Sequence, residues 1–214
     1  KLDGNYPVGT GNVALGDTAL DSVQSGGTYN TAIGHIAGTD ITTGIRNTII
    51  GAFSGDDLTD ADYNVTLGFG ALGSDTKGNK SIAIGVDALT AQNFTSSTDT
   101  YNVAIGYTAG ASVTTGVQNT LIGGLAGDAI TTGQANTAVG YNSLGANTTA
   151  NANVAVGYQS LSVNTTGTSN TALGTNTLVA NTTASNNVAV GYDSLRSNTT
   201  ANANTAVGYQ SLND

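Results

Sequence analysis

The stretch Asn153-Val154-Ala155-Val156-Gly157-Tyr158-Gln159-Ser160-Leu161 is one copy of a unit that returns along the whole 214-residue chain. Its glycine, taken as position zero, recurs at Gly16, Gly34, Gly51, Gly68, Gly85, Gly106, Gly123, Gly140, Gly157, Gly174, Gly191 and Gly208. The intervals are 18 residues, then 17 three times, then 21, then 17 six times. A fixed short period over a whole chain predicts stacked units, none of which buries its apolar side chains alone.

Each unit carries the signature of a short β-strand before its glycine. Positions −1 and −3 hold Val, Ile, Leu or Thr, and position −2 is nearly always Ala. Alternation with period two that ends at a glycine is typical of a strand. Seventeen residues leave no room for a helix beside the strand and its turns. The sequence therefore predicts an all-β fold, a parallel β-solenoid of about twelve coils spaced about 4.8 Å apart.

The alternation also divides the strand into two faces, because successive side chains of a strand point in opposite directions. We expect positions −1 and −3 to fill the core and Ala at −2 to point outward. Leu at position +4 is a second expected anchor, and where +4 is Gly an aliphatic residue appears at +7 instead. The predicted core column comprises Val139, Val156, Leu173, Val190 and Val207, with Leu161, Leu178 and Leu195 at position +4.

Position −4 is Asn in eleven of the twelve units, and Ser81 is the exception. Stacked Asn side chains can bond along the axis of a solenoid and satisfy backbone groups at turns. Position +8 is Thr in most units and predicts a second polar ladder. The predicted structural Asn ladder includes Asn102, Asn119, Asn136, Asn153, Asn170, Asn187 and Asn204.

The domain organisation follows from the period. Residues 1–11 are expected to be a lead-in or the end of a preceding coil, and residues 12–214 a single repeat array. The longest interval predicts a surface insertion near residues 90–100. Because the chain begins without Met and ends partway through a unit, we interpret it as a segment of a longer protein.

Composition excludes several classes of function. The net charge is −9 and only 9% of residues are charged, which argues against nucleic acid and anionic membranes as partners. Cysteine is absent, so the chain forms no disulfide. It has no apolar run of about twenty residues, and no membrane insertion is expected in this segment. No cofactor is expected.

The motifs NVAIG at Asn102–Gly106, NTAVG at Asn136–Gly140 and NTAVGYQSL at Asn204–Leu212 resemble a known repeat. They are similar to the head repeats of trimeric autotransporter adhesins, the Yersinia adhesin among them, and to repeats in phage tail fibres. Here Asn lies one residue nearer the glycine than in the adhesin signature, and the period is longer. The resemblance implies a left-handed β-roll, a homotrimer and a place in an extracellular fibre on a bacterial cell or virion.

Position −5 alternates aromatic and cationic residues in the N-terminal half, which favours cation–π contacts of about 0.5–1 kcal/mol each at exposed sites. This ladder either stiffens the array or offers a contact strip for a cell-surface glycan or receptor. Its members are Tyr29, Arg46, Tyr63, Lys80 and Tyr101. A second ladder at position +1 either packs between chains or remains exposed, and it comprises Tyr141, Tyr158, Tyr192 and Tyr209.

Catalytic chemistry finds little support. His35 is the only histidine and so the only possible base of a Ser-His-Asp triad. We expect His35 to be an ordinary surface residue. The acidic cluster Asp56, Asp57, Asp60 and Asp62 lacks the spacing of known Ca²⁺ loops, and stacking places Asp60 beside Lys77. We predict no catalytic residue and no metal site. Asn147, Asn164, Asn181 and Asn198 each begin an Asn-Thr-Thr sequon.

The sequence thus predicts a non-enzymatic structural segment of an extracellular fibre or adhesin. We expect three copies to associate, through the outward column of small residues at position −2. Two alternatives remain open. Regular Thr ladders are also found in ice-binding solenoids, and some β-solenoid tailspikes degrade glycans, although no acid pair for that reaction is visible.

Overall fold

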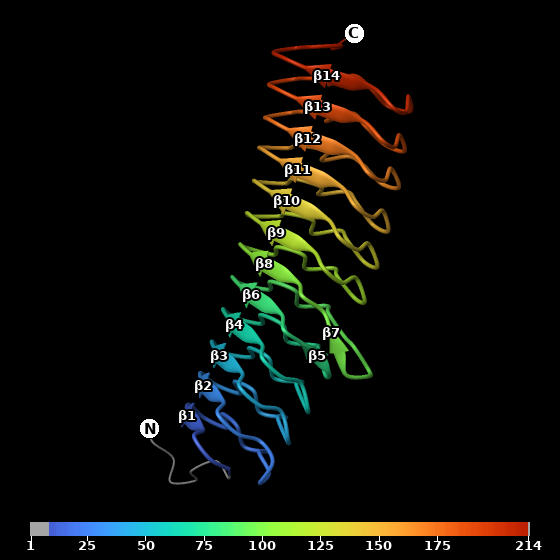
Figure 1. The fold of residues 1–214 in the computed structure, drawn as a ribbon. Helices are drawn as coiled ribbons and strands as arrows, with labels where there is room; N and C mark the ends of the chain where they lie inside the picture. Colours follow the sequence, from blue (N-terminus) through green and yellow to red (C-terminus); the bar gives the residue numbers. More distant parts are fainter. Residues whose placement is uncertain (1–8, 214) are drawn as a thin grey trace. The chain divides into compact units, whose positions relative to one another are not determined.

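The structure is a computed structural model that describes residues 9–213, so most of the lead-in predicted for residues 1–11 lies outside it. The chain forms two compact units, Lys1–Ile105 and Gly106–Asp214, and each is described by itself. Over the described residues there is no helix, and each unit is a parallel β-solenoid, as predicted (Figure 1). That residues 12–214 form a single array stays a prediction.

Each coil contributes one strand of three residues to the main sheet of its unit. In the first unit these strands are β1 (Val13–Leu15), β2 (Thr31–Ile33), β3 (Thr48–Ile50), β4 (Val65–Leu67), β6 (Ile82–Ile84) and β8 (Val103–Ile105). In the second they are β9 (Thr120–Ile122), β10 (Thr137–Val139), β11 (Val154–Val156), β12 (Thr171–Leu173), β13 (Val188–Val190) and β14 (Thr205–Val207).

Within a unit, consecutive strands pair in parallel so that equivalent positions of successive repeats lie side by side. Ala138 is the partner of Ala155, which is in turn the partner of Ala172. A shift of one residue would move every side chain to the other face, so this register fixes which positions form columns. The 17-residue period of the sequence is therefore the length of one coil.

The faces of the strands are the reverse of those predicted. Ala155 and Ala189 at position −2 are fully buried, whereas Leu173 is 47% and Val207 68% exposed. Val139, Val156 and Val190 are half-buried on the outer face of their strands, so none of the five residues assigned to the column at −1 lines the core. The outward Ala column proposed as the contact between copies is likewise wrong. The leucines at +4 were correctly assigned, because Leu161, Leu178 and Leu195 are buried.

The physical reason is the narrow interior of a 17-residue coil, in which the middle residue of the strand faces position +4. Where position −2 is large, position +4 is Gly. A Cβ on Gly127 would lie 2.7 Å from Leu121 and 2.8 Å from Ile130, and one on Gly55 would lie 3.4 Å from Ile49 of its own coil. Ile130, at +7, then supplies the second large side chain and is fully buried, as predicted.

The motif glycine is required where successive coils come closest. Gly157 has a φ of +138°, and a Cβ at this position would lie 2.3 Å from the carbonyl oxygen of Gly174. Any side chain would separate the two coils, and few L-residues adopt this φ. The same approach recurs at the equivalent glycines, which explains why position zero does not vary.

The Asn ladder at position −4 is confirmed. Asn153 donates from Nδ2 to the carbonyl oxygen of Gly167 at 2.9 Å, which closes its own coil. Its Oδ1 accepts a hydrogen bond from the backbone N–H of Asn170 in the next coil, with a distance of 3.0 Å between the two atoms. The side chain is fully buried, so these bonds satisfy groups that water does not reach.

The insertion near residues 90–100 is more than a surface loop. It contains β7 (Thr98–Asp99), which pairs in parallel with β5 (Gly78–Asn79) in a small second sheet (Figure 1). Gln92 is fully buried and Phe94 is 8% exposed. The insertion therefore contributes to the core of the first unit.

Candidate functional site

The ladder at position −5 forms one strip on the first unit. Tyr29, Arg46, Tyr63, Lys80 and Tyr101 all have φ between 51° and 61°, so the backbone turns each side chain outward in the same way. The Arg46 guanidinium lies 5.8 Å from the ring centroid of Tyr29 and 5.4 Å from that of Tyr63. The Lys80 ammonium lies 5.1 Å from the ring centroid of Tyr101. The predicted cation–π contacts are confirmed.

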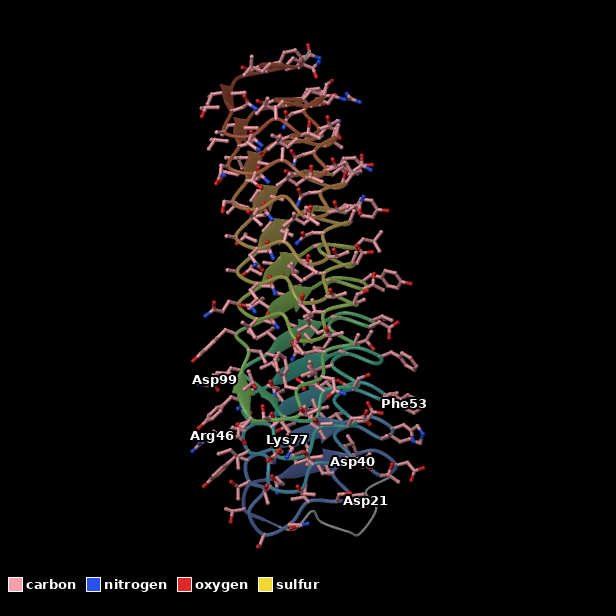
Figure 2. The ribbon with its side chains drawn as sticks, turned by 90° about the vertical axis from the view of Figure 1, so that its right-hand side faces the viewer. Asp21, Asp40, Arg46, Phe53, Lys77 and Asp99 are labelled. Atoms are coloured by element: carbon pink, nitrogen blue, oxygen red, sulfur yellow. The ribbon has the colours of Figure 1, made fainter. Side chains whose placement is uncertain are left out.

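Polar bonds hold the cations of this strip in place. Arg46 donates from an Nη to the Tyr63 hydroxyl at 2.6 Å, and Lys80 donates to the Tyr101 hydroxyl at 3.2 Å. Lys80 also pairs with Asp99, whose hydrogen bond raises the pKa of the lysine, and Lys80 in turn lowers the pKa of Asp99. Figure 2 shows Arg46 and Asp99 on the side of the first unit opposite to Phe53.

These contacts restrict what the strip could bind. Arg46 occupies a face of both Tyr29 and Tyr63, and Lys80 occupies a face of Tyr101. A sugar that stacked on those faces would have to displace the cations, which leaves the opposite ring faces, the ring edges and the hydroxyls as its contacts. Stiffening of the coils follows directly from the geometry, whereas glycan contact stays a prediction.

A second feature is the outer face of the strands, for which we use the name strand strip, meaning positions −3 and −1 of every coil. In the first unit Val13, Leu15, Val65 and Leu67 are between 37% and 52% exposed. An outward column of branched aliphatic side chains is unusual for a sheet face in contact with water. This surface was missed because the faces were assigned in reverse. The pairing of large residues at −2 with Gly at +4 is the sequence signal that could have revealed it.

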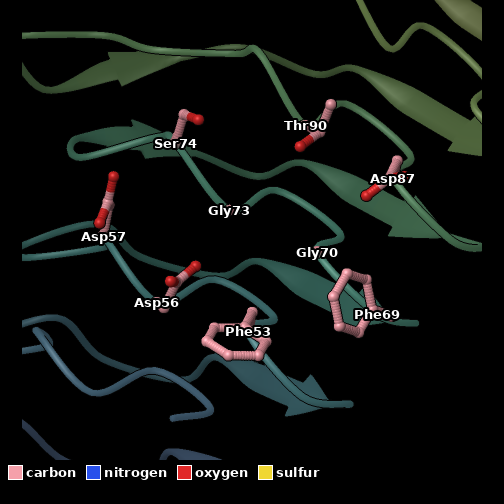
Figure 3. A pocket seen from close by; sticks show the side chains of 9 residues that line it. All are labelled: Phe53, Asp56, Asp57, Phe69, Gly70, Gly73, Ser74, Asp87 and Thr90. Atoms are coloured by element: carbon pink, nitrogen blue, oxygen red, sulfur yellow. The ribbon is translucent and has the colours of Figure 1, made fainter.

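A third feature is a notch of about 400 Å³ that three consecutive coils of the first unit form (Figure 3). The middle coil contributes Gly70 and Gly73 where its neighbours carry side chains, so the missing atoms create the space. The lining residues are Phe53, Asp56, Asp57, Phe69, Gly70, Gly73, Ser74, Asp87 and Thr90. Phe53 and Phe69 meet edge to face, with ring centroids 5.5 Å apart.

Asp56 and Asp57 line one side of this notch, and Asp87 lies across it (Figure 3). Partial burial raises the pKa of Asp56, and the charges of Asp57 and Asp40 raise it further. Partial burial and the charge of Asp40 also raise the pKa of Asp57. The described residues contain no group of three or more His, Cys, Asp or Glu side chains that could hold a metal ion. The notch therefore has an acidic wall but no metal-binding geometry.

His35 and Lys77 each lie in a pair with an aspartate at the surface. His35 lies edge to face with Phe53 at 5.4 Å, and its Nδ1 is 3.9 Å from Asp17. Lys77 lies 3.8 Å from Asp60, the pair that stacking predicted. His35 is about half-exposed, as expected for a surface position. Neither pair assembles a nucleophile, a base and an orienting group.

The Thr ladder at position +8 is bound into the backbone. Thr131 donates from Oγ1 to the carbonyl oxygen of Thr148 in the next coil at 3.1 Å, and Thr165 donates to Thr182 at 3.0 Å. These hydroxyls therefore spend their one donor on the backbone and have only acceptor lone pairs left for water. In the Asn-Thr-Thr sequons, Asn147, Asn164 and Asn181 are fully buried, so the folded chain does not present them for glycosylation.

Comparisons of the chain with protein-family models, curated protein sequences and solved structures found no match. In the part of the chain that the structure describes, no helix has the length and apolar character to cross a membrane. The class that the fold itself defines is a parallel β-solenoid built from a 17-residue repeat.

Proposed function

We propose that the chain is a non-enzymatic structural segment of an extracellular fibre or adhesin, in which three copies associate along the strand strip. One observation carries this proposal. The residues with the most regular aliphatic pattern in the sequence lie on the outside of the solenoid, while the interior is filled by Ala, Leu and Asn.

The strand strip of the second unit is free of charge. It comprises Thr120, Ile122, Thr137, Val139, Val154, Val156, Thr171, Leu173, Val188, Val190, Thr205 and Val207. All twelve are aliphatic or Thr, and Leu173 and Val188 are 47% and 38% exposed. Contiguous exposed apolar patches mark interaction surfaces in soluble proteins. The regular aliphatic pattern therefore supports an interface rather than a core.

Further copies of the same chain are the occupants that fit this strip. Two chains that each carry a net charge of −9 repel one another, so copies can approach most easily along a neutral surface. The strip also repeats at about 4.8 Å, and a second copy offers rows at the same spacing. A closed symmetric ring leaves no copy with an unpaired strip, and the resemblance to trimeric adhesin heads supports three copies.

The placement outside the cell rests on the same resemblance. Repeats of this kind hold a binding tip away from a bacterial or virion surface, which requires length and stiffness rather than a catalytic site. The Asn and Thr ladders and the cation–π strip at −5 all bind one coil to the next. A cell-surface glycan or receptor remains the proposed external partner, with contacts through the tyrosine hydroxyls of that strip.

The mass of the native particle tests the proposal. We expect sedimentation of the whole chain to give three copies, and the double substitution Val156→Lys/Val190→Lys to give monomers with an unchanged circular dichroism spectrum. The matched control is Thr166→Lys/Thr200→Lys, which adds the same charges to the same coils at exposed positions on another face and should leave the trimer intact. A monomeric parent chain, or a Val156→Lys/Val190→Lys variant that stays trimeric, would contradict it.

A further inference from the structure

The tyrosines at position +1 of the second unit form two stacked pairs. The rings of Tyr141 and Tyr158 have centroids 5.7 Å apart and an interplanar angle of 14°. Those of Tyr192 and Tyr209 are 5.6 Å apart at 11°. All four side chains are exposed, by 46% to 72%, so small solutes reach the rings.

The backbone fixes the register of these pairs. Gly157, next to Tyr158, donates its N–H to the carbonyl oxygen of Val139 at 2.8 Å, and Gly208 donates to Val190 at the same distance. The rings therefore stay one coil apart, and their position at the surface leaves the side-chain torsions room to bring two ring edges together. Reactive groups that are held side by side combine far faster than groups that meet by diffusion.

We propose that Tyr141–Tyr158 and Tyr192–Tyr209 are modification sites at which a one-electron oxidant forms dityrosine crosslinks within one chain. Each phenol loses one electron and one proton to give a tyrosyl radical. The two radicals join through a carbon–carbon bond between ring positions ortho to the hydroxyls. The hydrogen on each of these carbons then moves to the oxygen and restores two phenols. With hydrogen peroxide as the terminal oxidant of a haem peroxidase, the two electrons and two protons leave as part of two water molecules.

The other described tyrosines lack this geometry. Tyr107 also occupies position +1, but the next coil carries Gly124 there, and a Cβ on Gly124 would lie 3.7 Å from Tyr141. Thr175 separates Tyr158 from Tyr192 in the same way. In the −5 ladder Arg46 lies between Tyr29 and Tyr63. The chain thus contains reactive pairs and unpaired tyrosines of similar exposure.

Each crosslink would join residues 17 positions apart and act as a covalent tie between neighbouring coils. A tie of this kind restricts the unfolded chain, as a disulfide does, and should raise the melting temperature. The chain contains no cysteine with which to form a disulfide, so a covalent tie between its coils requires another side-chain chemistry, such as tyrosine coupling. This inference does not depend on the association of copies.

The test uses the whole chain with a small photo-oxidant, ruthenium tris-bipyridyl with persulfate, which accepts the two electrons and leaves as two sulfates. We expect dityrosine fluorescence, a band that keeps the single-chain mass on a denaturing gel, and crosslinked peptides that have lost two hydrogen atoms. Tyr158→Phe and Tyr209→Phe should each remove about half of the fluorescence, and the double variant nearly all of it. Phe retains the ring, so the fold is preserved.

Two further variants make the result specific. Tyr107→Phe should leave the fluorescence unchanged, because this residue has no tyrosine in the adjacent coil. Gly124→Tyr should add a crosslink to Tyr107 or Tyr141, since the position has room for a side chain. The proposal is overturned if the double variant Tyr158→Phe/Tyr209→Phe keeps its dityrosine, if the crosslinks join different chains, or if none forms while a free tyrosine peptide couples under the same conditions.

Discussion

Gln92 donates a hydrogen bond from Nε2 to the hydroxyl of Ser81 at 2.9 Å, in the one repeat whose position −4 is not Asn. Its Oε1 accepts a bond from Nδ2 of Asn102 at 2.8 Å, and its Nε2 also donates to Asp75 at 2.6 Å. The insertion that lengthens this coil thus brings in the side-chain amide that the ladder lacks. The replacement of Asn by Ser81 at position −4 and the insertion that carries Gln92 therefore compensate for each other.

Gln92→Ala should therefore destabilise the first unit. It leaves Asp75, Ser81 and Asn102, all fully buried, each without one partner, and a buried polar group left unpaired costs about 1–3 kcal/mol. Thermal unfolding should show a fall of several degrees, whereas Thr95→Ala at an exposed position of the same insertion should show almost none. Adding Ser81→Asn to Gln92→Ala should recover part of the loss. Equal effects of Gln92→Ala and Thr95→Ala would refute the role of Gln92.

The reversed faces give a direct test at two neighbouring residues. Ala155→Leu places three extra carbon atoms in a filled interior and should cost about 1–3 kcal/mol of unfolding free energy. Val156→Leu adds one carbon on the outer face and should change it by no more than about 0.5 kcal/mol. Denaturant unfolding of the two variants under dissociating conditions measures both. If Val156→Leu proved the more damaging, the faces would be those first expected from the sequence.

Leu161→Ala should be far more destabilising than Gln159→Ala. Leu161 is fully buried at position +4, and its truncation leaves a cavity that costs about 2–5 kcal/mol. Gln159 is a close control because its φ of 53° matches the 51° of Leu161, so both substitutions meet the same backbone conformation. Melting temperatures are the measurement, and similar shifts for the two variants would contradict the assignment of position +4 to the core.

Asn153→Ala should also be costly, for an electrostatic rather than a packing reason. It removes one of the two donors to the Gly167 carbonyl, the other being Asn164, and it leaves the buried N–H of Asn170 without its acceptor, at about 1–3 kcal/mol for that group. Asn151→Ala should cost less than about 1 kcal/mol, because Asn151 is exposed and water can replace its bond to Gln134. Equilibrium unfolding in urea compares the two.

The notch carboxylates predict a pH dependence. Burial first, and then neighbouring charges, raise the pKa of Asp56 and Asp57 above the ordinary 3.8, so the folded chain binds these protons more tightly than the unfolded chain. Their contribution to stability is therefore favourable in acid and is lost as pH rises through the raised pKa values. Asp56→Asn/Asp57→Asn should melt higher than the parent chain at pH 7, with the difference narrowing as pH falls towards 3.8. A difference that is constant with pH would contradict this account.

The sequence by itself determined the class of fold. A period of 17 with a strand signal in every unit has few physical solutions, since each coil needs a neighbour to pair with its backbone and cover its apolar side chains. The same columns identified the Asn ladder, the core leucines at +4 and the cation–π strip at −5. All of these depend on which residue type recurs at one position of the repeat. Because successive coils stack in register, residues at the same position lie in contact with one another.

Only the tertiary structure decided which side of the strand faces inward. Alternation shows that Ala155 and Val156 point in opposite directions, and hydrophobicity alone favours Val156 for the core. The closed coil reverses that choice, because its interior is too narrow for two branched columns beside Leu161, and Ala155 is the side chain that fits. The hydrogen bond of Gln92 with Ser81 could not be predicted from the sequence either, because the residues of an insertion have no equivalent positions in the other repeats. The inward face of the strand depends on the volume inside the coil, and the Gln92–Ser81 bond depends on how the longer coil folds. Neither can be read from the residue type at a single position.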